Sequence, residues 1–285
     1  MLAALAIAGL LAVDAQPALR GLPLVLLMLA AVIQMGRELA VAAIRRGWHL
    51  STPVMNFWSA IVVLHLIYFS RSASWSAALE LTFTVLVALF TLVLVAALTT
   101  DYKAHGWLLG LRDVVVSLLV STLLSLGLGC AAWLQAGSAH LATPDGSQRL
   151  AVLLLAVWAG AGLARLLETR GTDDPRPPAT LPGLLARLLV GAAVAAAALK
   201  VGPAAGAAAG LAAAAAAWVG HKALDALARW CQTPRFLCPL PHQFAALQPL
   251  YNRLFDSGVL DYGGGLVAAY PVAWLVLRAL APTTL

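Results

Sequence analysis

Long apolar segments separated by short polar stretches make up most of this chain. A helix needs about 20 mostly apolar residues to cross the hydrocarbon core of a bilayer. Segments close to this length and composition lie at 1–13, 22–44, 53–69, 77–99, 107–134, 150–167, 184–199, 203–219 and 264–280. They lack the alternation of polar and apolar residues that marks the strands of a membrane barrel. The pattern predicts an all-α fold, a polytopic integral membrane helix bundle with eight or nine membrane segments.

The first segment leaves the count open between eight and nine. Residues 1–13 are apolar, but they are fewer than a full span requires and no basic residue precedes them. We expect a short first span or a half-buried anchor. The alternative is a cleaved leader, with Ala15 and Ala18 as the small residues of a cleavage site.

Composition excludes a soluble or a disordered protein. Of the 285 residues, 62% are hydrophobic and 11% are charged, whereas a soluble domain has about 25% charged residues. The net charge of +6 comes from 18 Lys and Arg against 12 Asp and Glu. These cations are distributed between the apolar segments and form no compact patch, so nucleic acid is not an expected partner.

The distribution of Lys and Arg predicts the orientation of the chain. Most of them fall in loops that alternation places on one side of the membrane, namely 37–52, 100–113, 165–187 and 220–263. Basic loops face the cytoplasm, so we expect this side to be cytoplasmic. The bias holds only if 184–219 returns to the side it left. That segment is therefore two short spans or a re-entrant hairpin, with Gly202 and Pro203 at its turn.

Four regions are expected along the chain. Residues 1–134 supply the N-terminal membrane helices, 135–219 Ala- and Gly-rich helices, 220–263 a cytoplasmic amphipathic segment and 264–285 a C-terminal membrane helix. Within the third region, one helix face carries Leu247, Leu250, Tyr251, Leu254 and Phe255. This spacing predicts an interfacial helix near 245–256.

Polar side chains form a predicted stripe on helices 77–99 and 107–134, with His65 of segment 53–69 at a depth similar to Glu80, and we name this group the transport seam. Its members are His65, Glu80, Thr84, Thr91, Asp113, Ser117, Ser121 and Ser125. Ionisable groups inside a membrane are costly and often functional. The seam therefore suggests a hydroxyl-lined path with Glu80 and His65 as a proton or cation relay. The alternative is that the hydroxyls bond back to helix carbonyls, while Glu80 and Asp113 stabilise helix starts among the headgroups.

Two further groups of residues are expected at helix and membrane contacts. Gly202, Gly206 and Gly210 form two GxxxG steps, which allow close helix packing within the chain or in a homodimer. Arg45, Arg46 and Trp48 follow the long segment 22–44 and are expected to contact lipid headgroups; a plain positive-inside anchor is the alternative. Gln34, Arg37 and Glu38, near the end of the same segment, are interpreted as interface residues.

Metal and cofactor sites are not predicted. His221, Cys231, Cys238 and His242 are zinc-binding residue types, but their spacing matches no standard zinc motif. The sequence contains no GxxxxGK[ST], HExxH or GxSxG motif. We therefore predict no metal, no cofactor and no catalytic residue, and an enzyme is not favoured.

One stretch has a local likeness to a known family. It carries Arg46-Gly47, Ser51-Thr52, Phe57-Trp58 and Arg71. This order resembles the accessory N-terminal membrane domain of multidrug-resistance-type ABC exporters, and the resemblance would imply a docking or regulatory membrane domain. The segments after residue 107 do not resemble that family, and we do not assign the chain to it.

Two classes of function remain from the sequence. The transport seam predicts a transport protein for a small solute, an ion or a lipid, or the membrane subunit of a transport complex. The scarcity of buried charge and the Ala- and Gly-rich helices favour instead a non-catalytic scaffold or assembly subunit. A membrane enzyme acting on a lipid is a weaker alternative. The expected partners are the lipid bilayer and either further copies of this chain or foreign membrane subunits.

Overall fold

The computed structural model describes most of the chain. It covers 22–70, 107–136, 144–169, 180–233, 236, 238–255 and 258–280, together with residues 7, 9, 10, 13, 87, 90, 91, 94 and 95. Within these parts the chain is helical and contains no strand. The helices are α2 (Leu22–Ile44), α3 (Thr52–Ser70), α5 (Trp107–Ala136), α6 (Pro144–Glu168), α7 (Leu181–Ala198), α8 (Pro203–Cys231), the 3-10 helix η2 (His242–Leu247), α9 (Gln248–Leu254) and α10 (Val259–Leu280).

Among the described helices, six are long and apolar enough to cross a membrane: α2, α5, α6, α7, α8 and α10. The chain is therefore an all-α, multi-pass membrane-type bundle. The predicted count of eight or nine segments is not confirmed. α3 holds a shorter apolar stretch, Thr52–Ile67, and most of the predicted segments 1–13 and 77–99 lie outside the described residues.

Local sequence explains where several helices begin and end. The Thr180 hydroxyl accepts the N–H of Gly183 at 3.2 Å and caps α7. Gly202 adopts φ +95°, a conformation that favours glycine, and so permits the tight turn between α7 and α8. Pro203 then lies in the first turn of α8, where a missing N–H costs nothing.

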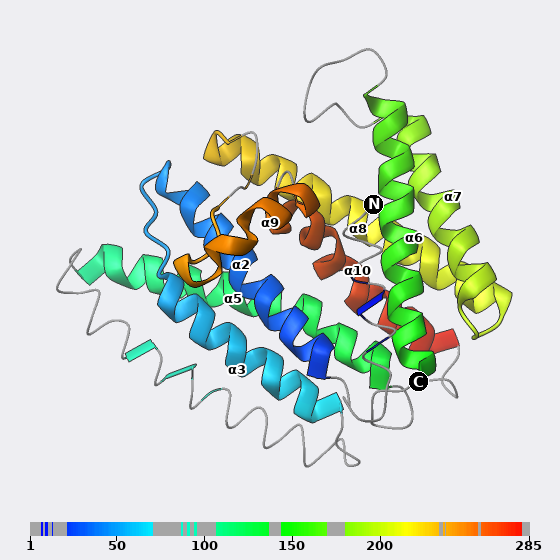
Figure 1. Cartoon of the computed structure of the whole chain (residues 1–285), viewed down its shortest axis with the longest axis horizontal. Helices are drawn as coiled ribbons and strands as arrows, with labels where there is room; N and C mark the ends of the chain where they lie inside the picture. The colour runs from blue at the N-terminus through cyan, green and yellow to red at the C-terminus, as the bar shows by residue number, and fades with distance from the viewer. Residues whose placement is uncertain are drawn as a thin grey trace.

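α10 is the central element of the bundle. It packs along α8 and also contacts α5 and α2, while α7 packs against both α6 and α8 (Figure 1). α3 packs against α5 on the other flank of the molecule. The main core is apolar and includes Met35, Leu134, Leu150, Leu153 and Leu277, each fully buried.

Polar contacts join helix ends into two groups. At the first, which we call the Arg45 end, the α2–α3 loop bonds to the start of α5 and to the end of α8. At the second, which we call the Lys200 end, Lys200 pairs with Asp145 at 3.4 Å and Gln135 bonds to Ser147 at 3.0 Å. Helices that cross the membrane in alternating directions would bring these same ends together. Which end faces the cytoplasm stays a prediction.

Candidate functional site

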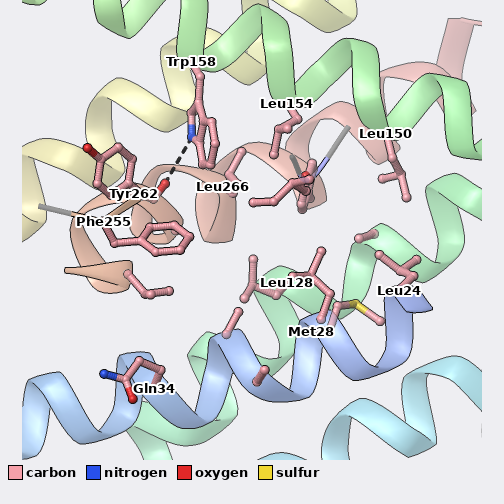
Figure 2. Close-up of a pocket in the computed structure, with 18 of the residues that line it drawn as sticks. Leu24, Met28, Gln34, Leu128, Leu150, Leu154, Trp158, Phe255, Tyr262 and Leu266 are labelled. Carbon is pink, nitrogen blue, oxygen red and sulfur yellow. Dashed lines mark hydrogen bonds between the residues drawn. The ribbon is translucent and has the colours of Figure 1, made fainter. Parts of the chain in front are cut away.

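An apolar cavity lies between α2, α5, α6 and α10. Its volume is about 240 Å³. Leu150, Leu154 and Trp158 recur every four residues, so they line up on one face of α6 (Figure 2). They face Met28 of α2 and Leu128 of α5 across the cavity. The cavity spans Leu24 to Gln34 on α2, a length of about 15 Å at 1.5 Å rise per residue.

The two ends of the cavity differ in polarity. Leu24 and Leu150 lie at one end and Gln34 at the other (Figure 2). Tyr251 and Tyr262 also line it, and the indole of Trp158 donates to the Tyr262 carbonyl at 3.3 Å. Gln34 is the lining residue on α2 nearest to Ile44, so the polar end points toward the Arg45 end.

Glu38 lies one helical turn beyond Gln34 on α2, next to the polar end of the cavity. Its side chain is buried, with 1% of the residue exposed. The carboxylate accepts the backbone N–H of Val259 at 3.0 Å and that of Leu260 at 2.7 Å. The first N–H groups of a helix lack intrahelical partners and carry partial positive charge. Glu38 of α2 therefore caps α10, a helix more than 200 positions later in the chain.

Tyr251 and Gln34 complete this network, which we call the Glu38 network. The Tyr251 hydroxyl donates to Glu38 Oε1. Gln34 Nε2 lies 3.0 Å from the Cys238 carbonyl and 3.2 Å from the Tyr251 hydroxyl oxygen. One amide thus ties the 238–255 segment to α2, and each buried polar group has a partner, as a low-dielectric site requires.

Burial changes the acidity of the groups that the loop contributes. It raises the pKa of the Tyr251 phenol, and the hydrogen bond and charge of Glu38 raise that pKa further. The phenol therefore stays protonated and keeps donating to the carboxylate. Burial also raises the pKa of the Cys238 thiol, which keeps this cysteine in its neutral form.

A glycine allows the close approach at the start of α10. Gly258 has φ +102°, and a Cβ there would lie 2.9 Å from Glu38 Oε2 and against the Phe236 carbonyl. Any other residue would be strained and would displace the carboxylate. Nearby, a Cβ on Gly263 would lie 2.8 Å from the sulfur of Met35, so small residues let α10 and α2 pack closely.

The Glu38 side chain lies inside the bundle and not on its surface, and its expected depth at the membrane interface stays a prediction. Arg37 is half-buried, and its guanidinium donates to Gln34 Oε1 and to the Pro239 carbonyl, both at 3.0 Å. The available signal was Gln34 and Glu38 four residues apart in an apolar helix, which places two polar groups on one face. Their partners from 238–260 could not be read from that spacing.

The structure places part of the transport seam at the Arg45 end. Asp113 accepts the N–H of His49 at 3.2 Å and pairs with Arg112 at 2.8 Å. Ser117 accepts the N–H of Ser51 at 2.9 Å. These two side chains therefore hold the loop that leads into α3.

Other seam hydroxyls bond along their own helices. Ser117 donates to the Asp113 carbonyl, Ser121 to the Ser117 carbonyl and Thr91 to the Val87 carbonyl. Ser125 is buried and its hydroxyl has no partner among the described residues. His65 is half-buried, whereas Glu80 and Thr84 lie outside the described residues. The seam as a solute path stays a prediction.

The glycine positions lie where α7 and α8 meet. A Cβ on Gly206 would lie 2.7 Å from the Ala195 carbonyl, and one on Gly210 would overlap the Gly191 carbonyl. Both are buried within the chain. Gly202 differs, since it caps α8 and nothing lies within 4 Å of a Cβ there.

Arg45, Arg46 and Trp48 lie together at the Arg45 end. Arg45 donates to the Gln232 carbonyl at 3.0 Å, and Arg46 donates to the Trp230 carbonyl. Trp48 packs edge-on against Trp230, with ring centroids 6.0 Å apart. The loop thereby stabilises the C-terminus of α8, whose last carbonyls lack helical partners.

Metal ligation has no support in the described part of the chain. There, no group of three or more His, Cys, Asp or Glu side chains lies close enough to share an ion. Cys231 and Cys238 are buried free thiols.

Comparison with known proteins assigns no family to this chain. No protein-family model matches the sequence, and no curated protein matches it. The functional argument therefore rests on the cavity and on the Glu38 network.

Proposed function

We propose that this chain is a lipid-binding membrane protein of the transport class, which holds one hydrocarbon chain of an amphiphile in the cavity between α2, α5, α6 and α10. The observation that carries this proposal is the shape and polarity of the cavity. It is long and apolar along its length, with the side chain of Gln34 at one end.

The lining favours a hydrocarbon chain over an ion or a polar solute. The side chains along the cavity are mainly Leu, Met, Ala and aromatic residues. An apolar cavity of about 150 Å³ stays dry and binds benzene, and this one is larger at about 240 Å³. An ion here would lose its hydration and find few polar partners.

The orientation of the cavity also suits a lipid. Its polar end points toward the Arg45 end, where charged side chains gather. Beside it, η2 and α9 expose Phe244, Leu247 and Leu250, as expected for an interfacial segment. A chain in the cavity would thus place its headgroup near the membrane surface and its tail at hydrocarbon depth.

Quenching by a brominated fatty acid tests the proposal. Dibromostearate quenches tryptophan on contact, and Trp158 lines the cavity. In detergent we expect saturable quenching that Trp158→Phe removes. Ala31→Phe fills the cavity and should weaken the saturable binding at least tenfold. Ala197→Phe, on the exposed face of α7, is the matched control and should bind like the native chain.

The contradicting result is equal quenching in all four proteins, because that would report partition into the micelle. A flux measurement distinguishes a protein that transports the lipid from one that only binds it. Vesicles containing the protein should exchange a fluorescent fatty acid between leaflets, and Ala31→Phe should slow this exchange. Saturable binding without exchange would instead favour a lipid-binding subunit of a larger complex.

A further inference from the structure

A cluster of arginine and tryptophan side chains lies outside the cavity, at the Arg45 end. Arg45, Arg46 and Trp48 of the α2–α3 loop meet Arg112 of α5 and Trp230 of α8 there. We call these five residues the arginine–tryptophan cluster. We propose that this cluster binds the phosphate of an anionic lipid headgroup from the surrounding bilayer.

The guanidinium groups are held in place but not saturated. Arg45 uses one N–H for the Gln232 carbonyl, and Arg46 uses its Nε for the Trp230 carbonyl. An arginine has five N–H donors in a fixed plane. Each side chain is therefore oriented by one backbone contact and keeps its other donors for an anion, which lowers the entropy lost on binding.

The charge balance of the cluster is positive. Arg112 pairs with Asp113, so its charge is compensated, and it packs over the Trp48 ring with its Cζ 4.3 Å from the ring centroid. Among the described residues, no acidic side chain pairs with Arg45 or Arg46. Within this part of the chain, the two exposed guanidinium groups therefore lack a counter-charge. Arginine suits phosphate because its planar donors bind two oxygens at once.

The surface below the cluster is apolar. Val41 and Ile44 on α2 are exposed, by 46% and 54%, and they precede Arg45 by four residues and by one. Val41 therefore lies one helical turn before Arg45, and Ile44, three residues from Val41, lies on the same face of α2 as Val41. Trp230 is 43% exposed, and tryptophan is enriched at headgroup depth. Cations above exposed aliphatic side chains match a lipid, with the phosphate on the arginines and the acyl chains along α2.

Native mass spectrometry of the purified full chain tests the proposal. The probes are phosphatidylglycerol and phosphatidylcholine with identical acyl chains, added at equal concentrations in detergent. We expect at least fivefold tighter binding of the first phosphatidylglycerol molecule. Arg45→Gln/Arg46→Gln should remove this preference. Arg165→Gln/Arg253→Gln, which removes two other exposed cations, is the matched control and should keep it.

Three results would overturn the proposal. These are equal binding of the two lipids by the native chain, an unchanged preference in Arg45→Gln/Arg46→Gln, and loss of the preference in the control. Inorganic phosphate is added as a further arm. Displacement of the lipid by phosphate at equal concentration would assign the cluster to a soluble phosphate and contradict a lipid site.

Because Arg45 and Arg46 also stabilise α8, a second variant keeps the test decisive. Arg45→Lys/Arg46→Lys preserves both charges but loses the planar donors. We expect a preference between that of the native chain and that of the Gln variant; a preference equal to the native one would contradict the role of the guanidinium plane. The cavity variant Ala31→Phe should leave this preference unchanged, which separates this site from the proposed cavity ligand.

Discussion

Glu38 Oε2 accepts the backbone N–H of Leu260 at 2.7 Å across 222 positions of sequence. Together with the bond from Val259, it fixes the start of α10 against α2. This contact also sets the position of Tyr251 and hence the polar end of the cavity.

Removing the Glu38 carboxylate should destabilise the bundle. Glu38→Ala leaves the N–H groups of Val259 and Leu260 buried without a partner, which costs about 1–3 kcal/mol for each lost partner. We expect a clear fall in the melting temperature in detergent. Tyr251→Phe is the matched control, because it keeps both capping bonds and should lower the melting temperature less. An equal effect of the two variants would contradict the capping role.

The contact between α7 and α8 should not tolerate a side chain at Gly206. Gly206→Leu would bring a Cβ to 2.7 Å from the Ala195 carbonyl, so the helices must separate, at a cost of about 1–3 kcal/mol. Gly162→Leu is the control, since Gly162 is exposed and nothing lies within 4 Å of its Cβ position. Thermal unfolding in detergent compares them, and equal melting temperatures would argue against tight packing at Gly206.

Variants of Asp113 and Ser125 can distinguish a structural role of the transport seam from a role as a solute path. Asp113→Asn weakens the bonds to His49 and Arg112 and should lower stability by about 1–3 kcal/mol. Ser125→Ala removes a buried hydroxyl that has no partner among the described residues, so its melting temperature should change little. If Ser125→Ala alters flux of a solute without altering stability, the seam is a path. If only Asp113→Asn has an effect, and on stability, the seam is structural.

Two ion pairs should differ strongly in their contribution to stability. Glu168 and Arg187 join α6 to α7 at 3.4 Å, with side chains 7% and 15% exposed. Glu168→Gln leaves a buried guanidinium without its counter-charge, and we expect a loss of about 3 kcal/mol. Lys200 and Asp145 are also 3.4 Å apart but 69% and 65% exposed. Asp145→Asn should therefore change the melting temperature little, and a larger effect there than at Glu168 would contradict this ranking.

The orientation of the chain can be measured with introduced cysteines. The three native thiols are buried, so a membrane-impermeant maleimide should label added positions selectively. We expect Gln243→Cys to be labelled from the cytoplasmic side and Lys200→Cys from the opposite side, because these residues lie at the Arg45 end and the Lys200 end. Labelling of both from one side would contradict the crossing of the membrane by α8.

Hydropathy alone locates most of the described helices. The predicted segment 22–44 coincides with α2. Segment 184–199 nearly coincides with α7, and segment 264–280 lies within α10. Apolar length is a property of the local sequence, which explains this agreement. The end of α8 was not predictable in the same way. It continues past 219 to Cys231 because Gly220 and Leu224 pack against Gly264 of α10, a contact that hydropathy does not contain.

The sequence by itself determined that this chain is a membrane helix bundle, because its apolar segments are long enough and its charges few enough to leave no soluble alternative. The tertiary structure alone decided which polar residues are functional candidates. Glu38 reads from the sequence as a border residue, and only the fold brings Tyr251, Val259 and Leu260 to its carboxylate. The physical reason is that burial and hydrogen bonding depend on partners distant in the chain, whereas helix formation in a membrane depends on neighbours.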